Sequence, residues 1–454
     1  MSNRCAVLFL FCLLPLALAS AAHAQTGSVS TAEETAARPG PDGWRQLGGP
    51  QRNFRVDSAE VATVWGAGGP TRLWSRPLGE GYSSILADGD LLVTMYRRND
   101  EEVVIALDAA TGATRWEYAY HAPLVHNGYF DVWLNSAGPG PYSTPLIAGD
   151  TVFAVGVDGL FHALDKRTGE LRWSYDLAAA FDVEEYNAFA SSPIAYGRIV
   201  MQPLGGSGRG VVALDRETGA IAWRSPAIDL GPGSPVLIEV DGQGQLVIVG
   251  QQELVGLDPR DGRRLWSHPH PNELGLNLSM PVWGGDNALF VSSGYDGGSR
   301  LIRLSQIGGR SAPEEVWFNN RMRVHFGNAL RIDGLLVAST GDFGPAFLAA
   351  VDAETGVEVW RERTFARAQM VNAGGLLVLL DEDGDLAVAS VTLDGLQVHA
   401  RASVLTSNAW TPPTLAGSTL YLRDRQQILA LDLGDPGSAP AERNARPRTA
   451  PGVR

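Results

Sequence analysis

The sequence predicts an all-β protein folded as an eight-bladed β-propeller. An eleven-residue pattern, ALDAATGATRW at residues 106–116, recurs from Ala163, Ala213, Gly256 and Ala350. Short apolar or alternating runs bounded by turn residues fill the intervals between the copies, and no segment of useful length has a helical period. Each interval between copies is long enough for several short strands. A repeat unit of that size is typical of a propeller, in which each unit forms one blade.

The repeated pattern has a structural explanation. In its Asp-x-x-Thr-Gly core, we expect the Asp side chain to accept hydrogen bonds from the backbone amides that follow it, and the Gly to supply the positive φ of a tight turn. The fourth strand of each unit then ends in Trp, whose ring can fill the wedge between neighbouring blades and bury about 200 Å². We expect structural interblade positions for Trp74, Trp116, Trp173, Trp223, Trp266, Trp317 and Trp360.

The number of blades follows from the order of the units. The tryptophans from Trp116 to Trp360 mark six units, and a degenerate seventh, ASVTLDGLQVH from residue 389, has His399 in the place of Trp. The last unit starts near Ala409 and stops after its third strand, while the strand TRLWSRPLG near the other end of the chain carries Trp74. We expect this N-terminal strand to complete the C-terminal blade, because a ring closed in this way leaves no exposed edge to pair with other chains.

The start of the chain is typical of a cleaved secretory signal. Arg4 precedes an apolar run and the small-residue stretch ASAAHA, which predicts a signal peptide over residues 1–24. The only cysteines, Cys5 and Cys12, lie inside it, and neither stands at the cleavage point, where a lipid anchor would be attached. The sequence therefore predicts an exported, periplasmic protein that is soluble, monomeric and not membrane-spanning.

The rest of the chain divides into four parts. Residues 25–43 are expected to form a disordered leader, and residues 435–454, rich in Pro, Ala and Arg, a disordered tail. We expect residues 44–70 to form a strap across one face of the propeller. The propeller itself is expected to occupy residues 71–434.

The repeated signature Ala-x-Asp-x-x-Thr-Gly-x-x-x-Trp resembles that of the pyrroloquinoline-quinone-like (PQQ-like) repeat β-propellers of the quinoprotein alcohol dehydrogenase-like superfamily. The likeness covers about residues 44–434, and GWRQLGGPQRNF from Gly43 is similar to the segment that precedes many of these propellers. It implies a non-catalytic binding or scaffold protein of the cell envelope, similar to the propeller subunit of the outer-membrane β-barrel assembly machinery. The alternative is a PQQ-dependent oxidoreductase of the alcohol or sugar dehydrogenase kind. A carbohydrate-active propeller is a third class, because two of the abundant carboxylates could act as acid and base.

The cofactor site of the dehydrogenases distinguishes these classes. By the resemblance, those enzymes hold PQQ between a Trp floor and two adjacent disulfide-bonded cysteines, beside a calcium ion bound by Glu, Asn and Asp. No adjacent cysteines exist here, so we expect no cofactor, no catalytic residue and no metal. In the alternative, PQQ with calcium, Trp410 is the candidate floor and DEDGD at residues 381–385 the candidate calcium loop, which we expect to be a polar hairpin turn. His268 and His270 could bind zinc together, or could be ordinary hydrogen-bonded histidines.

Function is expected where the blades differ. The segment 118–141 is much longer than a simple connection and rich in aromatic residues, and long loops on a rigid scaffold are where binding usually resides. This segment follows the fourth strand of one blade and leads to the first strand of the next, as do the segments near residues 181 and 318. All three should therefore lie on one face, near the channel mouth. We expect an envelope protein or peptide, or a saccharide, to bind there; alternatively, the long loop caps the channel. The net charge of −14 argues against nucleic acid as a partner. The candidate binding face consists of His126, Asn127, Tyr129, Phe130, Trp133, Glu184, Glu185, Tyr186, Arg321 and His325.

Overall fold

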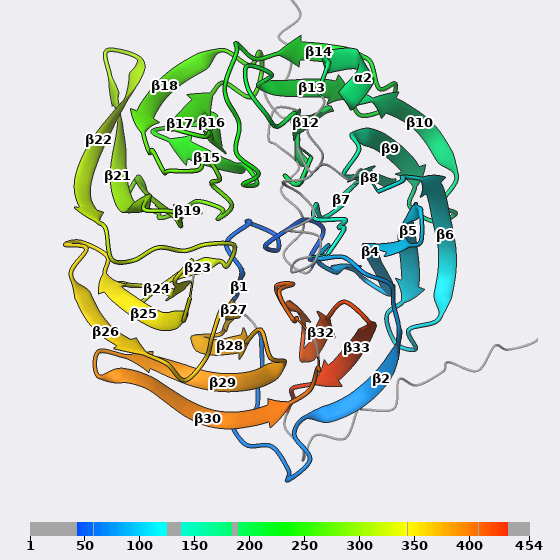
Figure 1. Cartoon of the computed structure of the whole chain (residues 1–454), viewed down its shortest axis with the longest axis vertical. Helices are drawn as coiled ribbons and strands as arrows, with labels where there is room; N and C mark the ends of the chain where they lie inside the picture. Colours follow the sequence, from blue (N-terminus) through cyan, green and yellow to red (C-terminus); the bar gives the residue numbers. More distant parts are fainter. Residues whose placement is uncertain are drawn as a thin grey trace, which may run out of the picture. The chain divides into compact units, whose positions relative to one another are not determined.

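The computed structural model describes residues 43–57, 59–124, 138–183, 189–342, 344–406 and 408–434, so the expected signal peptide, tail and nearly all of the leader lie outside the described residues. The described strands form eight sheets that stand around a central axis, as Figure 1 shows. In seven sheets four consecutive strands pair in antiparallel order, and the eighth takes its fourth strand from the N-terminal side. This arrangement confirms the predicted all-β, eight-bladed propeller.

The first four blades follow one another along the chain. Blade 1 contains β3 (Leu86–Asp88), β4 (Leu91–Arg98), β5 (Glu101–Asp108) and β6 (Thr114–His121). Blade 2 contains β7 (Leu146–Ala148), β8 (Thr151–Val155), β9 (Leu160–Asp165) and β10 (Leu171–Asp176), and the short helix α2 (Leu177–Phe181) comes after it. Blade 3 contains β11 (Ile194–Tyr196), β12 (Ile199–Pro203), β13 (Val211–Asp215) and β14 (Ile221–Arg224). Blade 4 contains β15 (Val236–Val240), β16 (Gln243–Val249), β17 (Glu253–Leu257) and β18 (Arg264–Pro269).

The last four blades complete the ring. Blade 5 contains β19 (Val282–Trp283), β20 (Ala288–Ser293), β21 (Gly298–Ile307) and β22 (Arg310–Asn319). Blade 6 contains β23 (Ala329–Ile332), β24 (Leu335–Thr340), β25 (Phe347–Asp352) and β26 (Glu358–Glu362). Blade 7 contains β27 (Gln369–Ala373), β28 (Leu376–Leu380), β29 (Asp385–Thr392) and β30 (Gly395–Ser403). Blade 8 contains β31 (Thr414–Ala416), β32 (Thr419–Arg423) and β33 (Gln427–Asp432) from the C-terminal side.

The ring closes by pairing two strands from opposite ends of the chain. β2 (Thr71–Pro77) lies antiparallel to β33, with Trp74 opposite Ala430, and is the fourth strand of blade 8. The pairing gives the outer edge of β33 the backbone partners that a chain ending there would lack. The predicted closure by an N-terminal strand is therefore confirmed.

The repeated Asp and Gly form the turn between the third and fourth strands. In blade 1, Asp108 Oδ1 accepts hydrogen bonds from the amide of Ala110 (3.2 Å) and from the amide and hydroxyl of Thr111 (3.0 and 2.8 Å). Gly112 has a φ of +69°, in the region that glycine adopts without strain. These bonds confirm the predicted turn chemistry. Equivalent bonds are accepted by Asp165, Asp215 and Asp352.

Most of the repeated tryptophans link their blade to the next one. Trp116 Nε1 donates to the carbonyl oxygen of Lys166 in blade 2 at 2.9 Å, and the indole ring lies against Gly169. A Cβ atom added to Gly169 would lie 2.6 Å from the ring, so this position needs glycine both for its φ of +75° and for the close approach. Equivalent indole bonds join Trp74 to Ala109, Trp173 to Arg216, Trp223 to Pro259, Trp317 to Ala353 and Trp360 to Thr392.

Trp266 is arranged differently. Its Nε1 donates to Oε1 of Gln245 in its own blade at 2.6 Å, and its ring stands over Gly256, its partner in the sheet. The following blade has RLSQIGGRSAPEEVW from residue 303 in place of the repeated pattern, and its β21 and β22 form a long hairpin. Blade 5 therefore lacks the turn whose carbonyl accepts the indole hydrogen bond in the other blades, and Trp266 bonds within blade 4 instead.

The contact between turn and ring gives a first testable prediction. Gly169→Ala is expected to lower the free energy of unfolding by about 2–4 kcal/mol, because alanine is strained at positive φ and its Cβ collides with Trp116. The matched control is Gly197→Ala, at a turn with a φ of +54° where an added Cβ meets no atom within 4 Å. This control should lose only the conformational part, about 1–2 kcal/mol. Urea denaturation measures both losses, and equal losses would show that the ring contact contributes nothing.

Residues 43–57 follow the inner edges of the first strands. Trp44 forms an antiparallel bridge with Ala87 of β3, and the carbonyl of Arg45 accepts a hydrogen bond from the amide of Ile147 in β7 at 2.8 Å. β1 (Arg55–Val56) pairs in parallel with β27. We expected residues 44–70 to form a strap across one face, but these bonds place its first part, residues 44–56, inside the ring. The physical reason is that the innermost strand of each blade has a free edge whose backbone groups need partners.

Helices contribute little to this architecture. In α2, the Asp176 side chain caps the N-terminus by accepting a hydrogen bond from the amide of Ala179. In the part of the chain that the structure describes, no helix has the length and the apolar composition needed to cross a bilayer.

Candidate functional site

One face of the ring collects the segments in which the blades differ. Neighbouring strands alternate in direction, so the connection from each fourth strand to the next first strand emerges at the same end as the turn between the second and third strands. The repeated Asp-Gly turns lie at the opposite end. We call the end with the connections the mouth face. Its centre is surrounded by the first strands, which are nearest the axis in Figure 1.

A continuous row of rings lies on the mouth face. Consecutive ring centroids are between 4.7 and 6.2 Å apart. The rings come from the connections that lead into blades 1, 2, 6 and 8 and from the β20–β21 turn of blade 5. In order they are Tyr142, Tyr82, Trp410, Phe326, His325 and Tyr295, which we call the mouth row. The first four of these rings are half-buried, so part of each residue's surface is exposed.

Ion pairs flank the mouth row. Glu382, in the turn between β28 and β29, accepts hydrogen bonds from Trp410 Nε1 (3.2 Å) and from Arg367 Nη1 (2.8 Å). Arg425 pairs with Glu80 at 2.5 Å. Partly exposed charges of both signs thus surround an apolar row, which is the usual anatomy of a protein-binding surface.

The candidate calcium loop is a hairpin turn, as expected from the sequence. It joins the antiparallel strands β28 and β29, and Asp381 Oδ1 accepts hydrogen bonds from the amides of Asp383 (3.1 Å) and Asp385 (2.9 Å). Burial raises the pKa of Asp381 to about 6. Asp385 instead pairs with Arg401, so the carboxylates of this loop have different partners. Among the residues that the structure describes, no three or more His, Cys, Asp or Glu side chains are grouped to hold a metal ion.

The mouth face does not fit the PQQ site that the resemblance implies. Trp410, the candidate floor, is stacked on Tyr82 (5.5 Å, 25°) and in contact with Phe326, so its ring belongs to a row of protein side chains. Its indole nitrogen is bonded to Glu382, the acid nearest to it, which is itself paired with Arg367. The cysteine pair has no counterpart in the sequence. We therefore derive no chemical step through a quinone.

His268 and His270 have separate hydrogen-bond partners. His270 is buried; its Nδ1 accepts from Arg300 Nη1 at 2.9 Å, because an arginine can only donate, and its Nε2 donates to Ser293 Oγ at 2.8 Å. His268 Nδ1 donates to the carbonyl of Pro269 at 2.9 Å. Burial, and then the positive charge of Arg300, lower the pKa of His270 to about 3.

The neutral state of His270 predicts a pH dependence. Its pKa is lower in the folded protein than the unfolded value of 6.5, so its contribution to stability is full above pH 6.5 and is lost as the pH falls towards 3. We expect His270→Gln, which keeps a donor and an acceptor but does not titrate, to lose about 2 kcal/mol less stability than the parent between pH 7 and pH 4.5.

Denaturation at both pH values provides the measurement for His270. Burial raises the pKa of Glu102 to about 7, an effect of opposite sign, but this residue is present in both proteins and drops out of the comparison. An identical acid loss in parent and variant would contradict the neutral assignment of His270.

Two of the candidate binding residues lie on the mouth face. The Arg321 side chain is 69% exposed, whereas His325 is buried with its Nε2 2.6 Å from the hydroxyl of Tyr295. Burial lowers the pKa of His325 to about 4. The other candidates lie outside the described residues: His126, Asn127, Tyr129, Phe130, Trp133, Glu184, Glu185 and Tyr186.

Most of the mouth row was missed by the sequence reasoning, although a signal exists. Tyr82, Tyr142 and Trp410 each stand four residues before the first strand of their blade, which begins at Leu86, Leu146 and Thr414 respectively. A fixed offset in successive blades places side chains at the same height around the axis, so aromatic residues at that offset are brought together by the ring.

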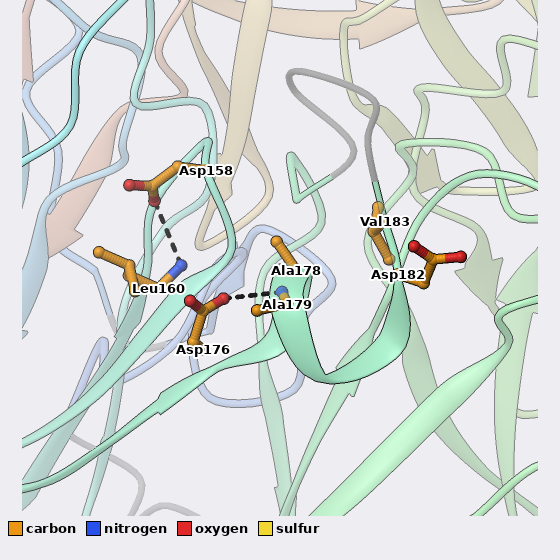
Figure 2. Close-up of a pocket in the computed structure, with 7 residues that line it drawn as sticks. All are labelled: Asp158, Leu160, Asp176, Ala178, Ala179, Asp182 and Val183. Atoms are coloured by element: carbon orange, nitrogen blue, oxygen red, sulfur yellow. Dashed lines mark hydrogen bonds between the residues drawn. The ribbon is translucent and has the colours of Figure 1, made fainter.

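A hollow of about 440 Å³ beside α2 is lined by three carboxylates, as Figure 2 shows. Asp158 accepts a hydrogen bond from the amide two residues on (3.2 Å), and Asp176 is the cap of α2. Asp182 lies 3.6 Å from Arg209. Turn and cap chemistry thus accounts for the acidic lining.

Comparison with known proteins connects this architecture to two groups of relatives. The family model described as "Outer membrane protein assembly factor BamB" matches residues 54–226, 131–321 and 309–442. The outer membrane protein assembly factor BamB of Burkholderia pseudomallei (strain K96243) is 24% identical over 352 residues, which are 69% of this chain and 86% of that protein. The quinohemoprotein alcohol dehydrogenase ADH-IIG of Pseudomonas putida is also 24% identical, over 74% of this chain and 40% of that protein.

Solved structures show the same fold in both groups. The crystal structure of BamB from Moraxella catarrhalis is similar with a TM-score of 0.56 and 16% identity, over 80% of this chain and 97% of that one. A europium-containing methanol dehydrogenase is similar with a TM-score of 0.62 and 14% identity, over 85% of this chain and 90% of that one. Because the family model matches segments from residue 54 to residue 442, the chain belongs to the PQQ-like repeat propeller family described as outer membrane protein assembly factor BamB.

Proposed function

We propose that this protein is a non-catalytic propeller of the cell envelope that binds a partner protein or peptide through its mouth face. The mouth row carries the proposal, because it brings rings from five blades together at the end of the ring where the blades differ. Aromatic side chains offer a large contact area at a small cost in conformational entropy and are enriched in binding surfaces.

The extent of the sequence similarities supports this function over catalysis. The match covers 86% of the assembly factor of Burkholderia pseudomallei but 40% of the alcohol dehydrogenase of Pseudomonas putida. Export to the periplasm, which residues 1–24 predict, is part of the proposal, since a binding partner in the envelope requires it.

The propeller supplies rigidity to the proposed surface. Indole bonds such as that from Trp116 to Lys166 fix each blade to the next, and the first strands that support the mouth row are buried. A partner segment therefore meets rings that are already in place, and less ordering entropy opposes binding.

Removing rings from the mouth row is expected to weaken partner binding without unfolding the propeller. For Tyr142→Ala with Phe326→Ala, we expect recovery of co-purified envelope proteins to fall roughly tenfold, because buried aromatic anchors dominate interface energies. The control pair is Val357→Ala with Leu393→Ala, at turns of the opposite face where the side chains are 63% and 71% exposed. Quantitative mass spectrometry gives the recovery and thermal melting gives the stability. Undiminished recovery from the mouth variant would refute the proposal.

The alternative is a PQQ-dependent oxidoreductase acting on alcohols or sugars, and the fold shared with the methanol dehydrogenase favours it. Titration of the mature protein with PQQ and calcium, followed by cofactor absorbance and thermal melting, separates the two functions. We expect no change in melting. Saturable one-to-one binding with a raised melting temperature would replace the proposed function by the alternative, and the same melting assay tests saccharides as ligands.

A further inference from the structure

We infer that an arginine-lined hollow between blades 5 and 6 binds the carboxylate side chains of an acidic peptide segment. The hollow measures about 310 Å³ and lies where the connection from β22 to β23 passes the β24–β25 turn, on the mouth face. The inference rests on the proposed function, since it names the chemistry of the partner. The side chains that line the hollow include Arg321, Arg323, Asp342, Phe347 and Arg361.

Strand alternation brings two arginines onto one ring. Arg361 lies in β26, Arg363 follows that strand, and residues two apart point to the same face of a sheet. Their guanidinium carbons lie 5.3 and 4.9 Å from the centroid of Phe347. The ring holds Arg361 in the lining of the hollow and Arg363 beside it by cation–π attraction, and it gives the hollow an apolar surface.

Hydrogen-bond donors at the hollow are left unused. Arg361 Nη2 donates to Glu358 at 2.7 Å and to the carbonyl of Arg321 at 3.3 Å, so its fork is already engaged with the wall of the hollow. Arg321 is 69% exposed and lies 4.0 Å from the same Glu358. Arg363 is exposed, and within the described part of the chain it forms no ion pair with an acid. The exposed guanidinium groups of Arg321 and Arg363 therefore have donors to offer to an incoming anion.

The acids around the hollow are already engaged. Asp342 Oδ2 accepts from the amide of Tyr295 at 2.7 Å, and Asp296 pairs with Arg323 at 2.6 Å. Glu358 is shared by Arg321 and Arg361. The four arginines outnumber these three acids, which makes the hollow locally cationic on a chain of net charge −14.

The donor geometry selects the ligand class. A guanidinium fork matches the two oxygens of a carboxylate, and arginine is more weakly hydrated than lysine, so an exchange of water for carboxylate is favourable here. The Phe347 ring can cover the methylene groups of a glutamate stem. An acidic segment of a partner protein satisfies both features.

A labelled peptide tests the inference on the full mature chain. The probe is fluorescein-hexaglutamate with an amidated C-terminus, titrated by fluorescence anisotropy at low ionic strength. We expect saturable binding that weakens roughly tenfold in Arg321→Gln with Arg363→Gln. The matched control is Arg224→Gln, which removes an arginine stacked 4.4 Å from Phe181 in blade 3, and it should change binding less than about twofold.

Either of two results would overturn the inference: no saturable binding by the parent protein, or an equal loss in the Arg224 variant, which would indicate general charge attraction. Because Arg321 and Arg363 are exposed, the variants should keep the parental melting temperature. Crosslinking at the mouth row tests the proposed function separately, so failure of the peptide to bind is distinguishable from failure of the proposed function.

Discussion

A chain that begins at residue 78 is expected to form oligomers or to precipitate instead of remaining a closed monomer. This truncation removes β2, so the outer edge of β33 (Gln427–Asp432) loses its partner along its length. It also removes Trp74, whose indole donates to Ala109 of blade 1 and whose ring lies on Gly112. An unpaired strand edge next to an open ring recruits strands from other chains.

The matched control begins at residue 59, which removes residues 43–57 with β1 but keeps β2. We expect this control to be less stable than the parent and still monomeric, because the ring remains closed. Light scattering coupled to size exclusion measures the assembly state of both chains. Closure by β2 would be unnecessary if the chain from residue 78 were monomeric and melted with the control.

Arg423→Met is expected to lower the free energy of unfolding by about 3–5 kcal/mol. The Arg423 side chain is fully buried at the end of β32, and its guanidinium donates to the carbonyls of Met95 (2.6 Å) and Gly79 (3.1 Å) and to Thr94 Oγ1 (3.2 Å). These acceptors lie in and beside blade 1, so one side chain joins the last blade to the first. Methionine fills part of the volume but leaves the acceptors buried without donors.

The control for Arg423 is Arg198→Met, which removes an 82% exposed side chain paired with Asp215 at 2.6 Å. Solvent screens such a pair, so we expect no measurable change in stability. Urea denaturation of both variants decides the point. Equal midpoints for parent and Arg423 variant would mean that the carbonyls find other donors and that Arg423 does not hold the ring closed.

Features that repeat along the chain could be predicted from the sequence. The spacing of Asp108, Gly112 and Trp116 determines a local turn, and the same spacing in later units gives the blades. The incomplete last unit and the strand at Trp74 could be matched because each lacks what the other supplies. Such inferences need only local chemistry and the rule that a ring must have no free edge.

The mouth row could not be predicted in this way, because its members come together only when the ring is closed. Tyr82 and Trp410 are more than 300 positions apart in the chain, yet their rings are stacked 5.5 Å apart. The length and aromatic content of segment 118–141 predicted a binding site there, whereas Tyr142 of the mouth row comes directly after that segment. Single aromatic residues in short connections give a weaker signal than a long loop.

The burial and the partners of polar side chains could not be predicted from the sequence either. Arginine is rarely buried, so nothing marked Arg423 or Arg52, whose guanidinium donates to the carbonyl of Pro235 at 2.7 Å. His270 was weighed as a zinc ligand because of its neighbour His268, but the structure shows that Arg300 and Ser293 are its partners. The burial of these side chains is stabilised by backbone carbonyls and side chains of other blades. The sequence alone does not predict how those groups are arranged in space.

The most direct test of the account is photocrosslinking in the envelope with benzoylphenylalanine at single positions. We predict adducts with a discrete partner from Tyr142 and Phe326 on the mouth face, and none from Val357 and Leu393, which are exposed at turns of the opposite face. Adducts from the opposite face alone, or from neither face, would contradict the claim that this propeller acts by binding a partner at its mouth.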